Sequence, residues 1–191
     1  MSTASGDRGR PPEDATATPV VLALGSNLGD RLANLRAGID ALTATGELTV
    51  TAVSPVYETA PVGGPDQPEY LNAVVVGRTS LPAQAVLGLA QDAEQALGRE
   101  RSVRWGPRTL DVDVIAVGAQ RSDDPHLTLP HPRAQERAFV LVPWLDADPG
   151  ATLPGGGPVA GLAARLGRDG IRRRDDLSLT RARPRAAERD G

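Results

Sequence analysis

Pro19-Val-Val-Leu-Ala-Leu24 is a continuously apolar run that ends at the turn residues Gly25-Ser-Asn27. A short apolar run closed by turn residues is typical of a buried strand. A helix is predicted next, over residues 30–44, because its leucines and isoleucine recur at helical spacing and Asp30 can cap its first turn. The fold is therefore expected to start with a β-α unit.

The same two patterns continue downstream of this unit. Alternating β-branched residues predict strands, helical apolar spacing predicts helices, and a cluster of prolines and glycines predicts a loop. The predicted elements are a strand at Leu48–Tyr57, a loop at Thr59–Glu69, a strand at Tyr70–Arg78, a helix from Pro82 to Leu97 that stops at Gly98, and a strand at Leu110–Val117. This β-α-β-β-α-β order predicts an α+β fold with a ferredoxin-like core, an antiparallel sheet flanked by helices.

A single domain over residues 19–167 is predicted. Its last part is expected to hold a polar loop at Gly118–Leu129 and helices near Arg133–Leu145 and Val159–Leu166. Residues 1–18 have almost nothing to bury, and residues 168–191 are rich in arginine with scattered acids. Both ends are therefore expected to be disordered tails, and a solvated basic tail is favoured over one that binds an acidic partner.

The composition excludes several kinds of chemistry. The chain of 191 residues contains no cysteine and no lysine, so all 21 basic residues are arginines. Disulfides, thiolate metal sites and thiol nucleophiles are excluded, as are a Walker-A lysine and Schiff-base catalysis. Arginine, backbone amides or a metal must therefore bind any phosphate.

The charge and the apolar pattern limit the partners. The net charge is −3, and the basic residues 168–191 leave the rest of the chain more acidic, which argues against broad nucleic-acid binding. No apolar run is long enough to predict a membrane span, and the first 18 residues do not resemble a signal peptide. A cytoplasmic protein is expected.

Asp111-Val-Asp113 is the sharpest local feature within a predicted strand. Side chains at positions i and i+2 of a strand point to the same face, so the two carboxylates are expected to stand side by side. Like charges that close repel unless a cation lies between them, and a carboxylate pair with substrate phosphates suits Mg²⁺. The alternative is a plain solvent-facing side of the sheet.

The segment upstream of this pair holds four arginines between Arg99 and Arg108, together with Trp105. Such a run is usually a solvated loop. Arginine forks also bind polyphosphate oxygens, and a tryptophan offers a flat face to a heterocycle. Beside the two acids, these residues indicate a nucleoside triphosphate as the ligand.

Several single residues are weaker candidates on their own. Tyr70 and Asn72 share a strand face and combine an aromatic ring with an amide. Gln91 and Glu94 lie on one side of a helix, where a solvated face is the ordinary interpretation. The remaining candidates are Asn27, which can be a plain turn residue, His131, which lacks partners for a zinc site, and Arg137 and Phe139, which can serve packing alone.

Five stretches, taken in order, resemble one family. They are Gly25-Ser-Asn-Leu28, Tyr57-Glu-Thr-Ala-Pro61, Asp66-Gln-Pro-Glu-Tyr-Leu-Asn72, Arg104-Trp-Gly-Pro-Arg-Thr-Leu-Asp-Val-Asp113 and Leu129-Pro-His-Pro132. Together they resemble the 6-hydroxymethyl-7,8-dihydropterin pyrophosphokinases, and the likeness covers about residues 19–165. The resemblance implies transfer of pyrophosphate from ATP to the pterin hydroxymethyl group, with release of AMP, in folate biosynthesis.

The resemblance also implies site residues. Asp111 and Asp113 match the family's metal pair and are expected to hold two Mg²⁺ ions, with Arg99 and Arg108 as further catalytic residues. Residues expected at ATP are Gln91, Glu94, Arg99, Arg101, Trp105, Arg108, His131 and Arg137. Residues expected at the pterin are Asn27, Thr59, Ala60, Val62, Tyr70, Asn72, Trp105 and Phe139.

Two other functions are weighed against this one. Another Asp-x-Asp magnesium enzyme, such as a nucleotidyltransferase, would use the acids and ATP but would not need an aromatic and amide set for a flat bicycle. A non-catalytic module that binds RNA would expose aromatic residues on its central strands, and this chain has few. A monomeric enzyme with small-molecule substrates, and with neither nucleic-acid nor membrane partners, is expected.

Overall fold

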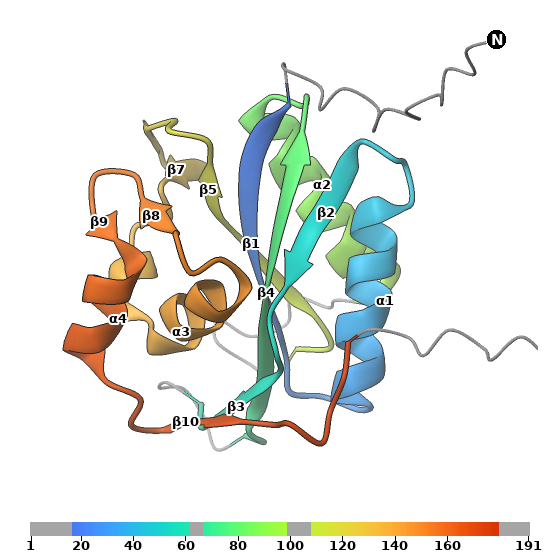
Figure 1. Cartoon of the computed structure of the whole chain (residues 1–191). Coiled ribbons are helices and arrows are strands. Elements are labelled where there is room, and N and C mark those ends of the chain that lie inside the picture. Colours follow the sequence, from blue (N-terminus) through green and yellow to red (C-terminus); the bar gives the residue numbers. More distant parts are fainter. Residues whose placement is uncertain (1–16, 62–66, 99–107, 180–191) are drawn as a thin grey trace, which may run out of the picture.

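Figure 1 shows the fold in a computed structural model, which describes residues 17–61, 67–98 and 108–179. Within these residues the main sheet has six strands in the order β10-β3-β4-β1-β5, with β2 also paired to β4. Every pair in this sheet is antiparallel. The strands are β1 (Thr18–Ser26), β2 (Leu48–Val53), β3 (Tyr57–Thr59), β4 (Tyr70–Thr79), β5 (Asp111–Val117) and β10 (Ile171–Arg173).

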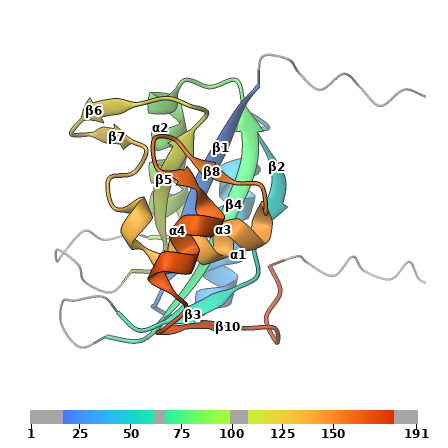
Figure 2. The same cartoon turned by 60° about the vertical axis from the view of Figure 1, so that its left-hand side comes forward.

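Helices cover both faces of the sheet (Figures 1 and 2). Helices α1 (Arg31–Thr43) and α2 (Ala83–Ala96) pack on one face, and α3 (Ala138–Ala147) and α4 (Val159–Leu166) pack on the other. The predicted α+β, ferredoxin-like fold is confirmed by this order and topology. No helix in the described ranges has both the length and the apolar character to cross a bilayer.

Strand alternation divides the buried residues into two cores. Val20, Leu22 and Leu24 of β1 belong to the core under α1 and α2, whereas Val21 belongs to the core under α3 and α4. Each fully buried side chain of this size contributes about 1.5–3 kcal/mol relative to its exposed state. Strand β1 therefore contributes buried side chains to the cores on both faces of the sheet.

The predicted helix signals agree with the structure. The side chain of Asp30 caps α1 by accepting a hydrogen bond from the backbone N–H of Ala33 at 3.0 Å. Gly98 lies just after α2 with a φ of +74°, a conformation that favours glycine and ends the helix.

The strand predicted at Leu48–Tyr57 is broken into β2 and β3, both of which pair with β4. Pro55 interrupts it, because proline has no backbone N–H to donate to a ladder. The Ser54 side chain supplies an extra contact with β4 at this point, because its Oγ accepts a hydrogen bond from the backbone N–H of Val74 at 2.9 Å. The short strand β3 thereby continues the sheet and pairs with β4 on one side and with β10 on the other.

Two predicted elements differ in detail. The polar loop at Gly118–Leu129 contains a hairpin, because Ser122 and Asp124 side chains accept backbone hydrogen bonds that tighten its turn. The helix predicted from Arg133 starts later, after a 3₁₀ turn. The elements are β6 (Ser122–Asp124), β7 (Leu127–Leu129), η1 (Ala134–Glu136), β8 (Thr152–Leu153) and β9 (Gly157–Pro158).

The two ends also differ from the predicted tails. The disorder predicted for residues 168–191 is wrong for their first part, because Ile171–Arg173 forms β10 and pairs with β3. At the other end, Thr18 already belongs to β1. Residues 1–16 and 180–191 lie outside the described residues.

Candidate active site

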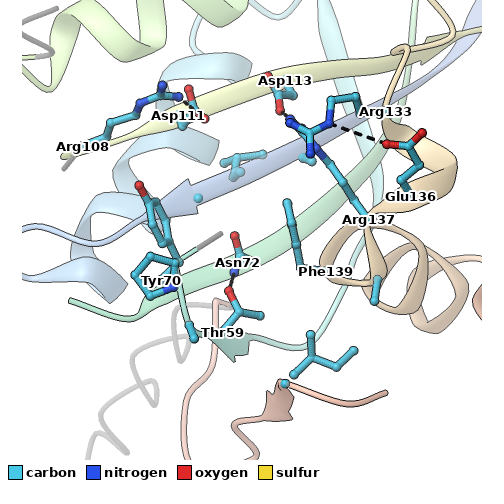
Figure 3. A pocket seen from close by; sticks show the side chains of 18 of the residues that line it. Thr59, Tyr70, Asn72, Arg108, Asp111, Asp113, Arg133, Glu136, Arg137 and Phe139 are labelled. Carbon is cyan, nitrogen blue, oxygen red and sulfur yellow. Dashed lines mark hydrogen bonds and ion pairs between the residues drawn. The ribbon is translucent and has the colours of Figure 1, made fainter. Parts of the chain in front are cut away.

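A cavity of about 680 Å³ lies on the α3 face of the sheet, beside the start of that helix (Figure 3). It brings together residues from β3, β4, β5 and the η1–α3 connection. The residues predicted from the sequence that line it are Thr59, Ala60, Tyr70, Asn72, Arg108, Asp111, Asp113, Arg137 and Phe139.

Strand alternation aims the two acids into this cavity. Val112 and Val114 point into the core under α1 and α2, so Asp111 and Asp113 face the opposite side of β5. On β4, Tyr70 and Asn72 face the same side as the acids (Figure 3). One face of the sheet therefore carries the two carboxylates of β5, here called the charged end of the cavity, and the ring and amide of β4, here called the neutral end. The Tyr70 ring lies close enough to Arg108 and Asp111 for their charges to act on it.

Each of the two β5 carboxylates is paired with its own arginine. The Arg108 Nη1 atom lies 2.6 Å from Asp111 Oδ2, and the Arg137 Nη1 atom lies 2.6 Å from Asp113 Oδ2 (Figure 3). Both acids remain partly exposed, at 23% and 32% of their side-chain areas. The charges are thus balanced, yet they stay accessible to a ligand.

The donor set fits Mg²⁺ bound together with substrate phosphates. In the part of the chain that the structure describes, no group of three or more histidine, cysteine, aspartate or glutamate side chains could hold a metal ion. Asp111 and Asp113 alone would offer two carboxylates, and Mg²⁺ is usually bound by one or two carboxylates that leave room for water and phosphate oxygens. This acid pair therefore suits a metal that arrives with its nucleotide.

His131 lies behind Asp113, with Nε2 at 3.8 Å from Asp113 Oδ2. Its Nδ1 atom accepts a hydrogen bond from the backbone N–H of Arg133 at 3.2 Å, so the neutral ring carries its proton on Nε2, toward the acid. Burial lowers the pKa of His131 despite the nearby Asp113. The ring adds a neutral donor beside the acid pair.

The side chains of β3 and β4 at the neutral end of the cavity are uncharged. Asn72 Nδ2 donates a hydrogen bond to Thr59 Oγ1 at 2.8 Å, which orients the amide (Figure 3). A side chain at Gly25 would meet Asn72 Oδ1 at 3.1 Å and the Tyr70 ring at 3.6 Å, so a larger residue would crowd both groups. Burial raises the pKa of the Tyr70 hydroxyl, against the opposing effect of the Arg108 charge.

Arg137 connects the two ends of the cavity. Besides its ion pair with Asp113, its guanidinium carbon lies 5.6 Å from the centre of the Phe139 ring. That distance is within the range of a cation–π contact. A ligand lying on Phe139 would therefore sit directly beside the charged end.

The chain is similar to proteins of one known family. A family model described as 7,8-dihydro-6-hydroxymethylpterin-pyrophosphokinase (HPPK) matches residues 21–149. The 2-amino-4-hydroxy-6-hydroxymethyldihydropteridine pyrophosphokinase of Mycobacterium tuberculosis H37Rv is 46% identical over 171 residues, which cover 81% of this chain and 89% of the relative. The chain belongs to the HPPK family. Its reaction is the transfer of pyrophosphate from ATP to the hydroxymethyl group of 6-hydroxymethyl-7,8-dihydropterin in folate biosynthesis, which gives AMP and the pterin diphosphate.

Other HPPK relatives and solved structures are also similar. The pyrophosphokinase of the same name from Pseudomonas aeruginosa PAO1 is 42% identical over 154 residues, with coverage of 81% of this chain and 95% of the relative. The crystal structure of wild-type Plasmodium falciparum HPPK-DHPS superposes with a TM-score of 0.61 at 13% identity. It covers 82% of this chain, which spans 48% of that solved chain, and it supports the fold alone.

Asn27, predicted at the pterin, does not line the cavity of this HPPK but holds two of its walls. The side chain is buried, and its Oδ1 atom accepts a hydrogen bond from the backbone N–H of Arg108 at 2.7 Å. Its Nδ2 atom donates to Gln67 Oε1 at 3.0 Å and to the carbonyl of Pro68 at 3.3 Å. Asn27 thus joins the backbone of Arg108 to the residues that precede Tyr70.

Glu94, predicted at the nucleotide, lies buried on α2 and supports the acid pair from behind. Its Oε1 atom accepts a hydrogen bond from the backbone N–H of Val112, the residue between the two acids, at 2.9 Å. Among the described strands β5 is an outer strand, so Glu94 supplies an acceptor to its unpaired edge. Gln91 is half-buried on the same helix, and neither residue lines the cavity. Their contact with ATP stays a prediction.

The remaining predicted residues cannot be placed. Val62, Arg99, Arg101 and Trp105 lie outside the described residues. Their assignment to ATP, to catalysis or to the pterin therefore stays a prediction from the family resemblance.

The cavity also contains residues that were not predicted from the sequence. Gly25 and Gln67 lie within two of the stretches that resemble the family, so the sequence already carried a signal for them. Arg133 and Glu136 belong to the η1 turn and form an ion pair at 3.7 Å (Figure 3). Three further lining residues, Asp169, Gly170 and Ile171, come from the supposed tail and carried no local signal.

Proposed function

We propose that this HPPK binds the ATP triphosphate at Asp111 and Asp113 and the pterin against Tyr70, Asn72 and Phe139. The observation that carries the proposal is that both sets line one cavity and meet at Arg137. A pyrophosphoryl group held at the acids would face a hydroxyl held at the amide end. Positioning of this kind supplies much of the acceleration in phosphoryl transfer.

The neutral end of the cavity suits a flat, polar bicycle. Phe139 offers an aromatic face for stacking, and Asn72 offers an amide that both donates and accepts hydrogen bonds. Since its Nδ2 atom already donates to Thr59, the Oδ1 atom beside Gly25 is oriented to accept from a ring N–H group. Thr59 and Ala60 complete this wall.

The charged end suits a triphosphate bound with metal. Asp111 and Asp113 would hold two Mg²⁺ ions, which neutralise phosphate charge and lower the pKa of the attacking hydroxyl. The guanidinium groups of Arg108 and Arg137, now paired with these acids, would then donate to phosphate oxygens. No dedicated base is needed when charge and position stabilise the transition state.

We also propose that the enzyme acts in the cytoplasm, as a monomer, on small molecules only. The support is the small-molecule reaction of the family and the chain's net charge of −3, which does not favour binding to nucleic acid. Light scattering behind a sizing column tests the monomer, and a dimer mass contradicts it.

The test of this site is an assay of AMP release with Mg²⁺ titrated from zero. Pterin-dependent AMP should appear only with Mg²⁺, and Asp113→Asn should abolish it while the melting curve stays cooperative. Asp123→Asn, on the exposed β6 strand, is the matched control. Full activity in EDTA, or an active Asp113→Asn enzyme, contradicts the metal assignment.

A further inference from the structure

Residues 168–179, here called the C-terminal strap, contain β10, the outermost strand on the β3 side of the main sheet (Figures 1 and 2). Ile171, Arg172 and Arg173 pair with Thr59, Glu58 and Tyr57 of β3 in antiparallel register. The family model matches only residues 21–149, so the strap lies outside the region that it describes.

Glu58 is the centre of the strap's attachment. Its side chain is only 4% exposed, and three arginines surround it: Arg31 at 2.9 Å, Arg172 at 2.5 Å and Arg174 at 2.7 Å. Burial acts to raise the pKa of this carboxyl, but the hydrogen bonds from Arg174 and Arg31 outweigh it and hold the pKa below its usual value. Glu58 is therefore a buried, ionised group, and two of its three cations come from the strap.

Further contacts fasten the strap on either side of Glu58. Asp146 Oδ2 accepts hydrogen bonds from the Tyr57 hydroxyl at 2.5 Å and from Arg173 Nη1 at 3.0 Å. The backbone N–H of Arg174 donates to the carbonyl of Val56 at 2.9 Å. Beyond them, Leu177 and Leu179 pack against the core under α1 and α2.

The fastened strap reaches the neutral end of the cavity. Asp169, Gly170 and Ile171 line it, and Ile171 is the backbone partner of Thr59, whose hydroxyl accepts the hydrogen bond from Asn72. Ile171 also packs against the same core as Phe139. The strap thus forms a wall next to the groups that would bind the pterin.

The Glu58 carboxylate is also linked to the chain segment just before Tyr70. Arg31, which pairs with Glu58, also donates through Nη1 to the backbone carbonyl of Glu69 at 2.7 Å. Glu69 directly precedes Tyr70. A single buried charge therefore connects the strap to the chain segment that presents Tyr70.

We propose that Glu58 is a positioning residue for pterin recognition: it fastens the C-terminal strap so that Asp169, Gly170 and Ile171 complete the pterin end of the cavity. This inference rests on the proposed function, because it assigns a substrate to that end. The contacts of Glu58 described above are with the strap and with the segment before Tyr70, whereas the two acids lie on β5, so we expect Glu58 to act mainly on the pterin.

The test uses the full chain with Glu58→Gln, which keeps the shape of the side chain and removes its charge. AMP release is measured with the pterin and ATP varied separately. The KM for the pterin should rise about tenfold, which equals about 1.4 kcal/mol of binding, while kcat and the KM for ATP stay within about twofold. Glu47→Gln, an exposed glutamate beside β2, is the matched control and should leave all three constants unchanged.

Arg174→Gln provides a second test from the strap side, should Glu58→Gln fold poorly. It should raise the KM for the pterin in the same selective way, and hydrogen exchange should become faster at residues 171–173. An unchanged pterin KM in a folded variant overturns the inference, as does a parallel rise of both KM values. A wild-type chain that makes no pterin-dependent AMP overturns the proposed function instead, which keeps the two failures distinct.

Discussion

The two ends of the cavity differ in charge and in how their side chains are paired. At the charged end, Asp111 and Asp113 are each neutralised by an arginine at 2.6 Å, so these groups satisfy one another before any ligand arrives. At the neutral end, Asn72 is oriented by Thr59, with glycine beneath it and a phenyl ring beside it. The carboxylates and arginines of the charged end must exchange partners to bind a ligand, whereas the neutral end can contact a ligand without breaking an ion pair.

This difference explains why the ends should respond differently to mutation. Ion pairs among arginines and carboxylates stabilise a site only while both partners remain, and the same groups serve the transition state when charge develops. A ring and an oriented amide contribute mainly to ground-state recognition of a flat substrate. Changes at the charged end should therefore lower kcat, and changes at the neutral end should raise the KM for the pterin.

The largest effect is expected for Asp113→Asn. The substitution keeps the size of the side chain but removes the charge that would hold Mg²⁺, so kcat should fall about 1,000-fold or more. Steady-state AMP release measures this loss. A fall in pterin affinity with kcat preserved would break the proposed division between the two ends.

Arg137→Ala should have the next largest effect, because this guanidinium contacts both ends. We expect kcat to fall about 100-fold from the lost phosphate donor, with a smaller rise in the pterin KM from the lost contact with Phe139. Kinetics with each substrate varied in turn measure both. Arg165→Ala, on the exposed side of α4, is the control, and an equal loss there would show that the effect is not local.

Asn72→Ala should act on the neutral end alone. Loss of a single amide contact is worth about 1 kcal/mol, so the KM for the pterin should rise about five- to tenfold while kcat changes by less than about threefold. Gln120→Ala, an exposed amide after β5, serves as the control. A kcat defect as large as that of Arg137→Ala would mean that Asn72 belongs to the charged end.

The last prediction concerns stability and not turnover: the free energy of unfolding should depend on pH through Glu58. The pKa of folded Glu58 lies below its usual value of 4.5, so its stabilisation is present above that pH and is lost as the pH falls through the folded pKa. Urea unfolding should give a wild-type advantage over Glu58→Gln of about 1–3 kcal/mol at pH 7. The advantage should shrink at pH 3, and a constant difference across this range would contradict the ion-pair account.

Much of the fold and of the acid pair could be predicted because their signals are local. Apolar alternation in β1 and helical spacing in α1 depend on neighbours a few residues away, and the same period of two aligns Asp111 with Asp113. The break at Pro55 was visible in the sequence as well, but its repair by Ser54 depends on β4.

The supporting residues could not be predicted, because their partners are distant in the sequence. Asn27 and Glu94 carry polar groups that suit ligand binding, and only the packing of Arg108 and β5 against them reveals the backbone groups that they also hold. Arg172-Arg-Arg-Asp-Asp176 has the composition of a solvated tail. Its order depends on Glu58, which lies more than a hundred residues upstream.

The most direct test of the two-ended cavity is to identify which phosphorus is attacked. Phosphorus NMR of the wild-type reaction with ATP, Mg²⁺ and 6-hydroxymethyl-7,8-dihydropterin resolves the products. If the acids hold the triphosphate with its β-phosphorus toward the pterin hydroxyl, AMP and the pterin diphosphate should accumulate in equal amounts. Accumulation of ADP with a pterin monophosphate, or of free phosphate without a pterin product, would contradict this account.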